Sequence, residues 1–178
     1  TDHIPATLCV VGAGVIGVEF ASIFARLGSN VTMVEYAKEI LPPFDGDIAK
    51  RLRHSRTKQG IAINTAAAVT SIEQIDNGLR VNFEQKGKAT SAEAEVVLVA
   101  VGRAPRVNTL NLEAAGVEYS PRGIVVDDNM QTNVPGIYAV GDVNARCMLA
   151  HAATFQGLRA LHHILGEADG IRLDIIPS

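Results

Sequence analysis

Three glycines near the start of the chain have the spacing of a phosphate-binding loop. The stretch VVGAGVIGVEF places Gly12, Gly14 and Gly17 in the pattern G-x-G-x-x-G, between a strand-like run and a helix-like run. In this pattern the first glycine makes a tight turn, the second lets the backbone approach a pyrophosphate, and the third lets the helix pack closely on the strand. The amides of Gly14, Val15 and Ile16 at the helix start suit a dianion. The sequence therefore predicts a dinucleotide site.

An acidic residue follows at the spacing that this motif requires. Glu35 ends the strand-like run NVTMVE, and an acid in this place accepts the ribose hydroxyls of NAD. The carboxylate would repel the 2′-phosphate of NADP, since two like unit charges ~4 Å apart cost about 4 kcal/mol at an effective dielectric of ~20. No arginine stands beside it. Glu35 therefore predicts NAD rather than NADP; the alternative is a solvated acid at a strand end.

A second acid of interest lies far downstream, in AVGDVNARCMLAHAA at residues 139–153. Asp142 follows Gly141 at the end of the strand-like run IYAV. From the residues alone, an acid that caps a turn is the ordinary interpretation. An ionised carboxylate accepts hydrogen bonds only, and it would therefore also match a polyol ligand.

The elements that must position these residues can be predicted from hydrophobic periodicity. Strands are expected at ATLCVV, NVTMVE and IAIN, and helices at 15–28 and 47–60. Three alternating runs then follow, and Asn77-Gly78 and Lys86-Gly87 separate them as hairpin turns. They predict an antiparallel meander, inserted before the parallel sheet resumes at 96–102. Further strands are expected at 122–128 and 136–142, and a closing helix at 151–166. The fold class is α/β, a Rossmann-like parallel sheet with an inserted three-stranded antiparallel β-meander.

Composition excludes several other classes of function. The chain has 178 residues, 47% of them hydrophobic and 20% charged, and a net charge of −3, so no basic face for nucleic acid is expected. No apolar run approaches the ~20 residues of a membrane span. Cys9 and Cys147 have neither metal nor redox-pair spacing, which is typical of a reducing cytoplasm. We expect no metal site and no catalytic residue in this chain. Because it starts at Thr1 and stops in DIIPS, we interpret it as a piece of a longer protein.

Four stretches taken in order resemble the pyridine nucleotide-disulfide oxidoreductases, over essentially the whole chain. They are IPATLCVVGAGVIGVEFASIFARLGSNVTMVE, VVLVAVGRAPRVNTLNLEAAGVE, TNVPGIYAVGDV and MLAHAA. The resemblance implies that Glu35 holds the adenosine ribose, Val69 flanks the adenine, Gly102 meets the nicotinamide half and Arg103 braces the structure. It also implies that the NAD pyrophosphate is wrapped by Gly12, Ala13, Gly14, Val15, Ile16, Gly17, Val18 and Glu19, with Glu19 near the nicotinamide.

The same resemblance assigns the later part of the chain to a flavin domain. Residues 1–122 would be the NAD-binding domain, and residues 123–178 the returning, incomplete segment of the FAD-binding domain. Asp142 would then hydrogen-bond the ribityl hydroxyls of FAD. The isoalloxazine would lie along Met148, Leu149, Ala150 and His151. The cofactors implied are NAD and FAD.

The chemistry implied passes electrons from a dithiol, dihydrolipoamide in the preferred interpretation, through an enzyme disulfide and a flavin to NAD. A closely spaced cysteine pair, a first flavin loop and a His–Glu base are absent from this chain, so we expect the reaction to require a larger parent. The resemblance implies a homodimer that serves 2-oxo acid dehydrogenase or glycine-cleavage complexes. The alternatives are mercuric, glutathione or trypanothione-type reductases, a flavoprotein transhydrogenase, or a non-catalytic NAD-sensing module. For the residues after Gly123 we expect either disorder or an exchanged, dimeric tail.

Overall fold

The computed structural model describes residues 2–177. Contacts divide the chain into two compact units, Thr1–Gly102 and Arg103–Ser178. This division falls earlier in the sequence than the functional boundary predicted after residue 122. Each unit has its own hydrophobic core.

The first unit is built on a four-stranded parallel sheet with the strand order β3-β2-β1-β7. Its strands are β1 (Thr7–Val11), β2 (Asn30–Val34), β3 (Ala62–Asn64) and β7 (Val96–Val99). The crossovers that parallel strands require are supplied by helix α1 (Val15–Arg26) and helix α2 (Gly46–Lys58). Strand β7 pairs with β1 on the side away from β2, so the strand order reverses between β1 and β7. In sheets of this kind, ligands bind outside the carboxyl ends of the strands at this reversal point.

The predicted meander is confirmed as a separate three-stranded antiparallel sheet. It comprises β4 (Ala67–Ile75), β5 (Gly78–Gln85) and β6 (Lys88–Ala94). Gly78 has φ +131°, and a Cβ there would lie 2.5 Å from the carbonyl oxygen of Ala94. The turn therefore requires glycine for two reasons, its backbone conformation and the closeness of its neighbour.

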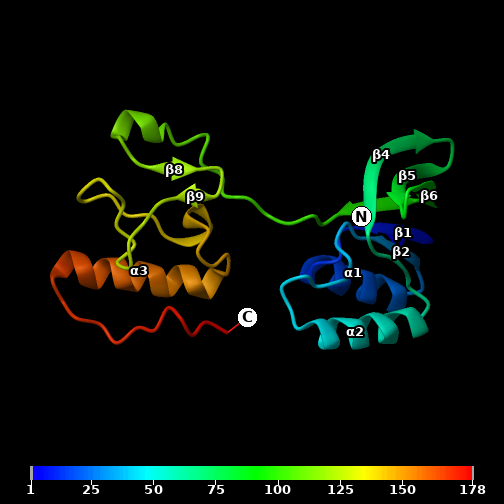
Figure 1. The fold of residues 1–178 in the computed structure, drawn as a ribbon, viewed down its shortest axis with the longest axis horizontal. Coiled ribbons are helices and arrows are strands. Elements are labelled where there is room, and N and C mark those ends of the chain that lie inside the picture. The colour runs from blue at the N-terminus through cyan, green and yellow to red at the C-terminus, as the bar shows by residue number, and fades with distance from the viewer. Residues whose placement is uncertain (1, 178) are drawn as a thin grey trace. The chain divides into compact units, whose positions relative to one another are not determined.

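Successive residues of β1 point to opposite faces of the parallel sheet and create two cores. Leu8 and Val10 pack with residues of α1 and α2, whereas Cys9 and Val11 pack with Val81 and other residues of the meander. The helices and the meander therefore cover opposite faces of the sheet (Figure 1). Burial raises the pKa of the Cys9 thiol to about 11, which keeps it neutral and unreactive at physiological pH.

The second unit contains little regular structure besides one long helix. Its elements are η1 (Leu112–Ala115), β8 (Tyr119–Ser120), β9 (Gly123–Ile124), η2 (Gly141–Asn144) and α3 (Ala150–Leu165). Residues of η1, of β9 and of the adjoining segments form a small core of Val107, Leu112, Val117, Ile124 and Ala139. Figure 1 shows the β8–β9 hairpin and helix α3 of this unit. The predicted closing helix is confirmed as α3.

Two strand predictions in this unit are wrong in extent. The run at 122–128 pairs only through β9, and the run at 136–142 forms no strand, only a bridge between Gln131 and Tyr138. A strand needs a continuous ladder of backbone hydrogen bonds to a neighbour, and along this run the structure describes only the short pairing around Tyr138, in which the amide of Ala139 donates to the carbonyl oxygen of Met130 at 3.0 Å. Both alternatives expected for the residues after Gly123, disorder and an exchanged tail, stay predictions.

Candidate functional site

Close backbone contacts fix the glycine-rich loop at the reversal point of the sheet. Gly12 has φ +99°, and a Cβ on it would lie 2.4 Å from the carbonyl oxygen of Ala100, just beyond β7. A Cβ on Gly17 would lie 2.1 Å from the carbonyl oxygen of Gly12. Gly12 therefore lets the chain turn beside β7, and Gly17 lets α1 approach the end of β1, as the motif predicts.

Gly14 differs from these two glycines because it faces open space. No heavy atom lies within 4 Å of the position that its Cβ would take, and its φ of −69° suits any residue. Packing within this unit therefore does not require glycine here, but a ligand close to the backbone would. The amides of Gly14, Val15 and Ile16 have no hydrogen-bond partner among residues 2–177, and no acid lies in the first turn of α1. This cradle fits a diphosphate.

Glu35 lies beside the loop, and it is bound more firmly than a solvated acid would be. Its side chain is 8% exposed. The amide of Ala13 donates to Oε2 at 2.5 Å, and the amide of Ala37 donates to Oε1 at 2.6 Å. Each carboxylate oxygen keeps a further lone pair for a ligand. Glu35 therefore fixes the phosphate loop to the end of β2, a role that the sequence did not predict.

The other predicted NAD contacts of the first unit are spread over several elements. Val15, Ile16 and Glu19 are exposed on α1, while Val18 is buried against the sheet. Val69 is half-buried and packs on the core shared with the meander. The strand that carries it begins beside Glu35, because the amide of Ala67 donates to the carbonyl oxygen of Glu35 at 2.9 Å.

Gly102 lies just beyond the end of β7, close in sequence to the carbonyl that crowds Gly12. It has φ +110°, and no atom lies within 4 Å of the position of a Cβ. Both the conformation and the open space agree with a backbone that a ligand can approach. The contacts of Val69, Glu19 and Gly102 with a dinucleotide remain predictions.

Asp142 belongs to the second unit, where it lies in the turn η2. One Nη of Arg103 donates to its Oδ2 at 3.1 Å, and Oδ1 has no partner within the described residues. Gly141 has φ +79°, and a Cβ there would lie 3.2 Å from the Cβ of Ala153 on α3. The backbone conformation of Gly141 therefore favours glycine, and the packing against α3 leaves little room for a side chain.

The four residues predicted to lie along the isoalloxazine surround the start of α3. Met148 and Leu149 are half-buried, Leu149 is the N-cap, and Ala150 and His151 are exposed. The helix has no side-chain cap and no acid in its first turn, so its first amides are open to an acceptor. His151 contacts the carbonyl oxygen of Pro177 through Nε2 at 2.7 Å.

A buried amide network supports the Asp142 turn, and the sequence analysis missed it. Gln156 of α3 is 2% exposed. Its Oε1 accepts from the amide of Gly141 at 2.7 Å and from Nδ2 of Asn144 at 2.8 Å. Asn144 donates in addition to the carbonyl oxygen of Ala139 at 2.9 Å. The available signal was a glutamine between Ala152 and Ala160 on the buried stripe of the helix.

Replacing Gln156 by leucine is expected to destabilise the second unit by about 2 kcal/mol, because two buried donors lose their acceptor. The measurement is hydrogen exchange of the Gly141 amide, which should become much faster. Gln131→Leu is the matched control, since the Gln131 side chain makes no hydrogen bond among the described residues. Equal exchange of Gly141 in the two variants would show that the network does not hold the turn.

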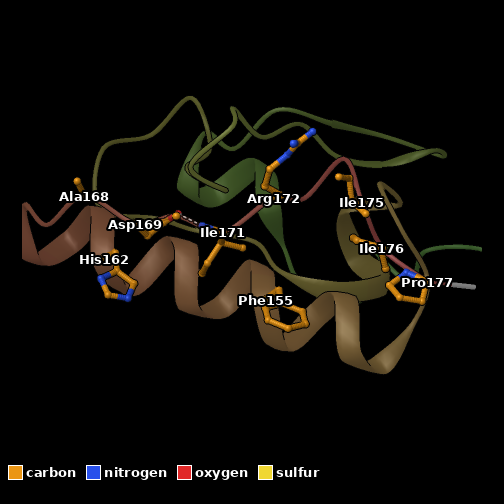
Figure 2. Close-up of a pocket in the computed structure, with 10 residues that line it drawn as sticks. Phe155, His162, Ala168, Asp169, Ile171, Arg172, Ile175, Ile176 and Pro177 are labelled. Atoms are coloured by element: carbon orange, nitrogen blue, oxygen red, sulfur yellow. Dashed lines mark hydrogen bonds between the residues drawn. The ribbon is translucent and has the colours of Figure 1, made fainter.

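The structure has two cavities of similar size, one in each unit. One, of about 540 Å³, lies between α3 and residues 168–177 (Figure 2). Its charges are already paired: Arg159 donates to Asp169 at 2.7 Å, which lowers the pKa of that carboxyl, and Arg172 pairs with Asp174. The amide of Ile171 also donates to Asp169 at 2.9 Å (Figure 2). The other cavity, of about 570 Å³, lies between α1 and α2.

Within residues 2–177 no three His, Cys, Asp or Glu side chains are grouped as a metal ion would need. None of the described helices combines the length and the apolar character needed to cross a bilayer.

A parallel sheet with a glycine-rich loop at its reversal point, an acid at the end of β2 and an open cradle over Gly14 defines a dinucleotide-binding protein. Comparison with known families narrows this class to one family. Residues 1–157 match the family described as pyridine nucleotide-disulphide oxidoreductase, and the chain belongs to this family.

Relatives agree with this assignment. Dihydrolipoyl dehydrogenase of Bacillus subtilis is 42% identical over 166 residues, which are 93% of this chain and 36% of the relative. Leghemoglobin reductase of Glycine max is 40% identical over 180 residues, which are 99% of this chain and 34% of the relative. The chain thus spans about a third of the length of these curated relatives.

Solved structures show the same fold. LpdA of Mycobacterium tuberculosis superposes with a TM-score of 0.86 at 33% identity, covering 97% of this chain and 37% of LpdA. The HOCl-induced flavoprotein disulfide reductase RclA of Escherichia coli gives 0.85 at 32% identity, covering 98% of this chain and 39% of RclA. The family is named for pyridine nucleotide, and the similar RclA structure is that of a flavoprotein; both agree with the predicted cofactors NAD and FAD.

Proposed function

We propose that residues 1–102 bind NAD(H) as the nicotinamide-nucleotide part of a larger flavoprotein disulfide oxidoreductase. One observation carries the proposal: the open space at Gly14, bounded by three free amides and adjoining a loop that Glu35 holds in place. The amides bind the diphosphate, and the free lone pairs of Glu35 orient the adenosine ribose.

In the second unit, we assign the residues from Gly123 onward to the flavin side. Oδ1 of Asp142 accepts from a ribityl hydroxyl, while Arg103 retains Oδ2. The first amides of α3, around Ala150 and His151, donate to the flavin ring. NAD and FAD, when bound, supply the hydride-transfer chemistry; the residues of this chain bind and orient.

We further propose that the parent is a dihydrolipoyl dehydrogenase, which oxidises dihydrolipoamide with NAD⁺ as a cytoplasmic homodimer within 2-oxo acid dehydrogenase or glycine-cleavage complexes. The support is the name and the 42% identity of the Bacillus subtilis relative, and the 40% identity of the mitochondrial dihydrolipoyl dehydrogenase of Pisum sativum over 99% of this chain.

A second candidate keeps the family and changes the substrate. Leghemoglobin reductase matches at 40% identity over 99% of the chain, and RclA shares the fold at 32% identity. A reductase that acts on another acceptor is therefore the alternative. Assaying the full-length parent with dihydrolipoamide, and with other disulfides and dithiols in parallel, separates the two candidates.

The nucleotide assignment is tested on the chain itself by titration with NADH, NADPH and FAD. NADH should bind more tightly than NADPH, and FAD weakly or not at all. Gly14→Ala should weaken NADH binding by more than about tenfold, or ~1.4 kcal/mol, with an unchanged melting temperature, because its Cβ enters only the space reserved for the ligand.

Gly46→Ala is the matched control for this experiment. Gly46 begins α2, and a Cβ there also meets no atom within 4 Å. This variant should bind NADH as the unsubstituted chain does. If Gly14→Ala bound NADH with wild-type affinity, the loop would not be part of the NADH site. Tight stoichiometric FAD uptake would contradict the interpretation that this chain holds only an incomplete part of the FAD-binding domain.

A further inference from the structure

The cleft between α1 and α2 has the size and lining of a small-molecule site. Its volume of about 570 Å³ lies within the ~300–1,000 Å³ of typical ligand pockets. Apolar side chains of both helices and of the connecting segment form most of the wall: Val15, Val18, Ile23, Leu41, Phe44 and Leu52. The polar lining comprises Glu19, Ser22, Arg26 and Arg56.

Two arginines line the cleft without an ion pair to any described residue. Arg56 donates through Nη1 to the neutral Oε1 of Gln59 at 2.7 Å, while its Nε is buried without a partner in the described part of the chain. A buried donor without an acceptor is unfavourable. Arg26, on the facing helix, makes no ion pair with any described residue. Within residues 2–177, neither guanidinium forms an ion pair with a carboxylate.

The charge balance of the lining selects an anion. Two arginines oppose one acid, Glu19, which has no ion pair among residues 2–177. A guanidinium presents a planar fork of donors, and a carboxylate is the acceptor that matches this fork. In the 540 Å³ cavity of the second unit, by contrast, Asp169 and Arg172 each have a protein partner already.

The cleft adjoins the dinucleotide cradle at one end, where it is lined by Val15, Val18 and Glu19, which are also predicted NAD contacts. The cradle uses backbone amides at the first turn of α1, whereas the cleft uses side chains along the helix as far as its last residue, Arg26. At 1.5 Å per residue, Arg26 lies about 16 Å along the axis from Val15.

We propose that this cleft binds a small organic monoanion, a carboxylate with an apolar chain. The carboxylate lies between Arg26 and Arg56, after a small rotation of Arg56 that brings Nε to the ligand. The chain of the ligand packs on Phe44 and Leu52. The site would serve a metabolite that resembles a short fatty acid.

The test is calorimetric titration of the 178-residue chain with octanoate, at low salt and with saturating NADH present. Octylamine and octanol are the charge-reversed and neutral probes. Octanoate should bind at least about tenfold more tightly than either probe, and its affinity should fall with added salt. The proposal would be overturned by equal affinity for the three compounds, by competition between octanoate and NADH, or by the absence of octanoate binding at about 10 mM.

Variants locate the site. Arg56→Met and Arg26→Met should each weaken octanoate binding by about tenfold or more, whereas Arg51→Met, the same change on an exposed residue of α2 outside the cleft, should not. Glu19→Gln should tighten binding about threefold by removing the like charge. A gain of affinity cannot arise from misfolding, so this variant decides the matter even if Arg56→Met fails to fold. Equal losses in Arg51→Met and Arg26→Met, or no gain in Glu19→Gln, would contradict the site.

Discussion

Replacing Gly17 by alanine is expected to destabilise the first unit by about 3 kcal/mol or more. The new Cβ would lie 2.1 Å from the carbonyl oxygen of Gly12 and 3.1 Å from its carbonyl carbon. Both are backbone atoms of the loop, so no side-chain rotation relieves the clash, and α1 must move away from β1. Since a domain is stable by only ~5–15 kcal/mol, a large share of its stability would be lost. The measurement is urea-induced unfolding, with NADH binding followed in parallel.

Comparison with Gly14→Ala separates the effect on stability from the effect on NADH binding. Both positions are glycines of one motif, yet a Cβ at position 17 would clash with the backbone of the loop, whereas a Cβ at position 14 would face open space. We expect stability to fall in Gly17→Ala alone, and NADH affinity to fall in both variants. If Gly17→Ala unfolded at the same urea concentration as the unsubstituted chain, the close approach of α1 to the loop would be disproved.

Replacing Glu35 by arginine is expected to lower NADH affinity by about 100-fold or more and to shift the preference toward NADPH. The change removes charge-assisted bonds to the ribose, each worth ~1.5–3 kcal/mol, and it places a cation where a 2′-phosphate would lie. Because the amides of Ala13 and Ala37 also lose their acceptor, stability should fall by about 1–3 kcal/mol. Fluorescence titration with both reduced nucleotides measures the ratio of the two affinities.

Two further variants separate charge from anchoring. Glu35→Gln keeps one acceptor oxygen and should weaken NADH binding without improving NADPH binding. Glu84→Arg, the same change of charge on an exposed residue of β5, should alter neither affinity. An unchanged ratio of NADH to NADPH affinity in Glu35→Arg would exclude Glu35 from the ribose site.

The sequence predicted the first unit well because its signals are local. A strand, three spaced glycines and a helix follow one another directly, and Asn77-Gly78 specifies a hairpin through backbone geometry alone. The predicted strand at 136–142 failed for the opposite reason. Its apolar residues suit a strand, but strand formation depends on a neighbour that local sequence does not specify.

Burial and partners in space explain what the sequence did not predict at the site. The position of Glu35 followed from spacing, but its bond to the amide of Ala13 depends on how β2 and the loop approach each other. Likewise, a glutamine on a helix is usually solvated, and only the packing of α3 on the Asp142 turn makes Gln156 a buried acceptor.

Ala13 is held on both of its backbone polar groups. Its amide donates to Glu35, and its carbonyl oxygen accepts from the amide of Leu41 at 2.8 Å. The loop is thus rigid before any nucleotide arrives, and little conformational entropy remains to be lost on association. We therefore expect the nucleotide to bind in one step, without a slow rearrangement of the loop, and variants of the loop to change mainly the rate of release.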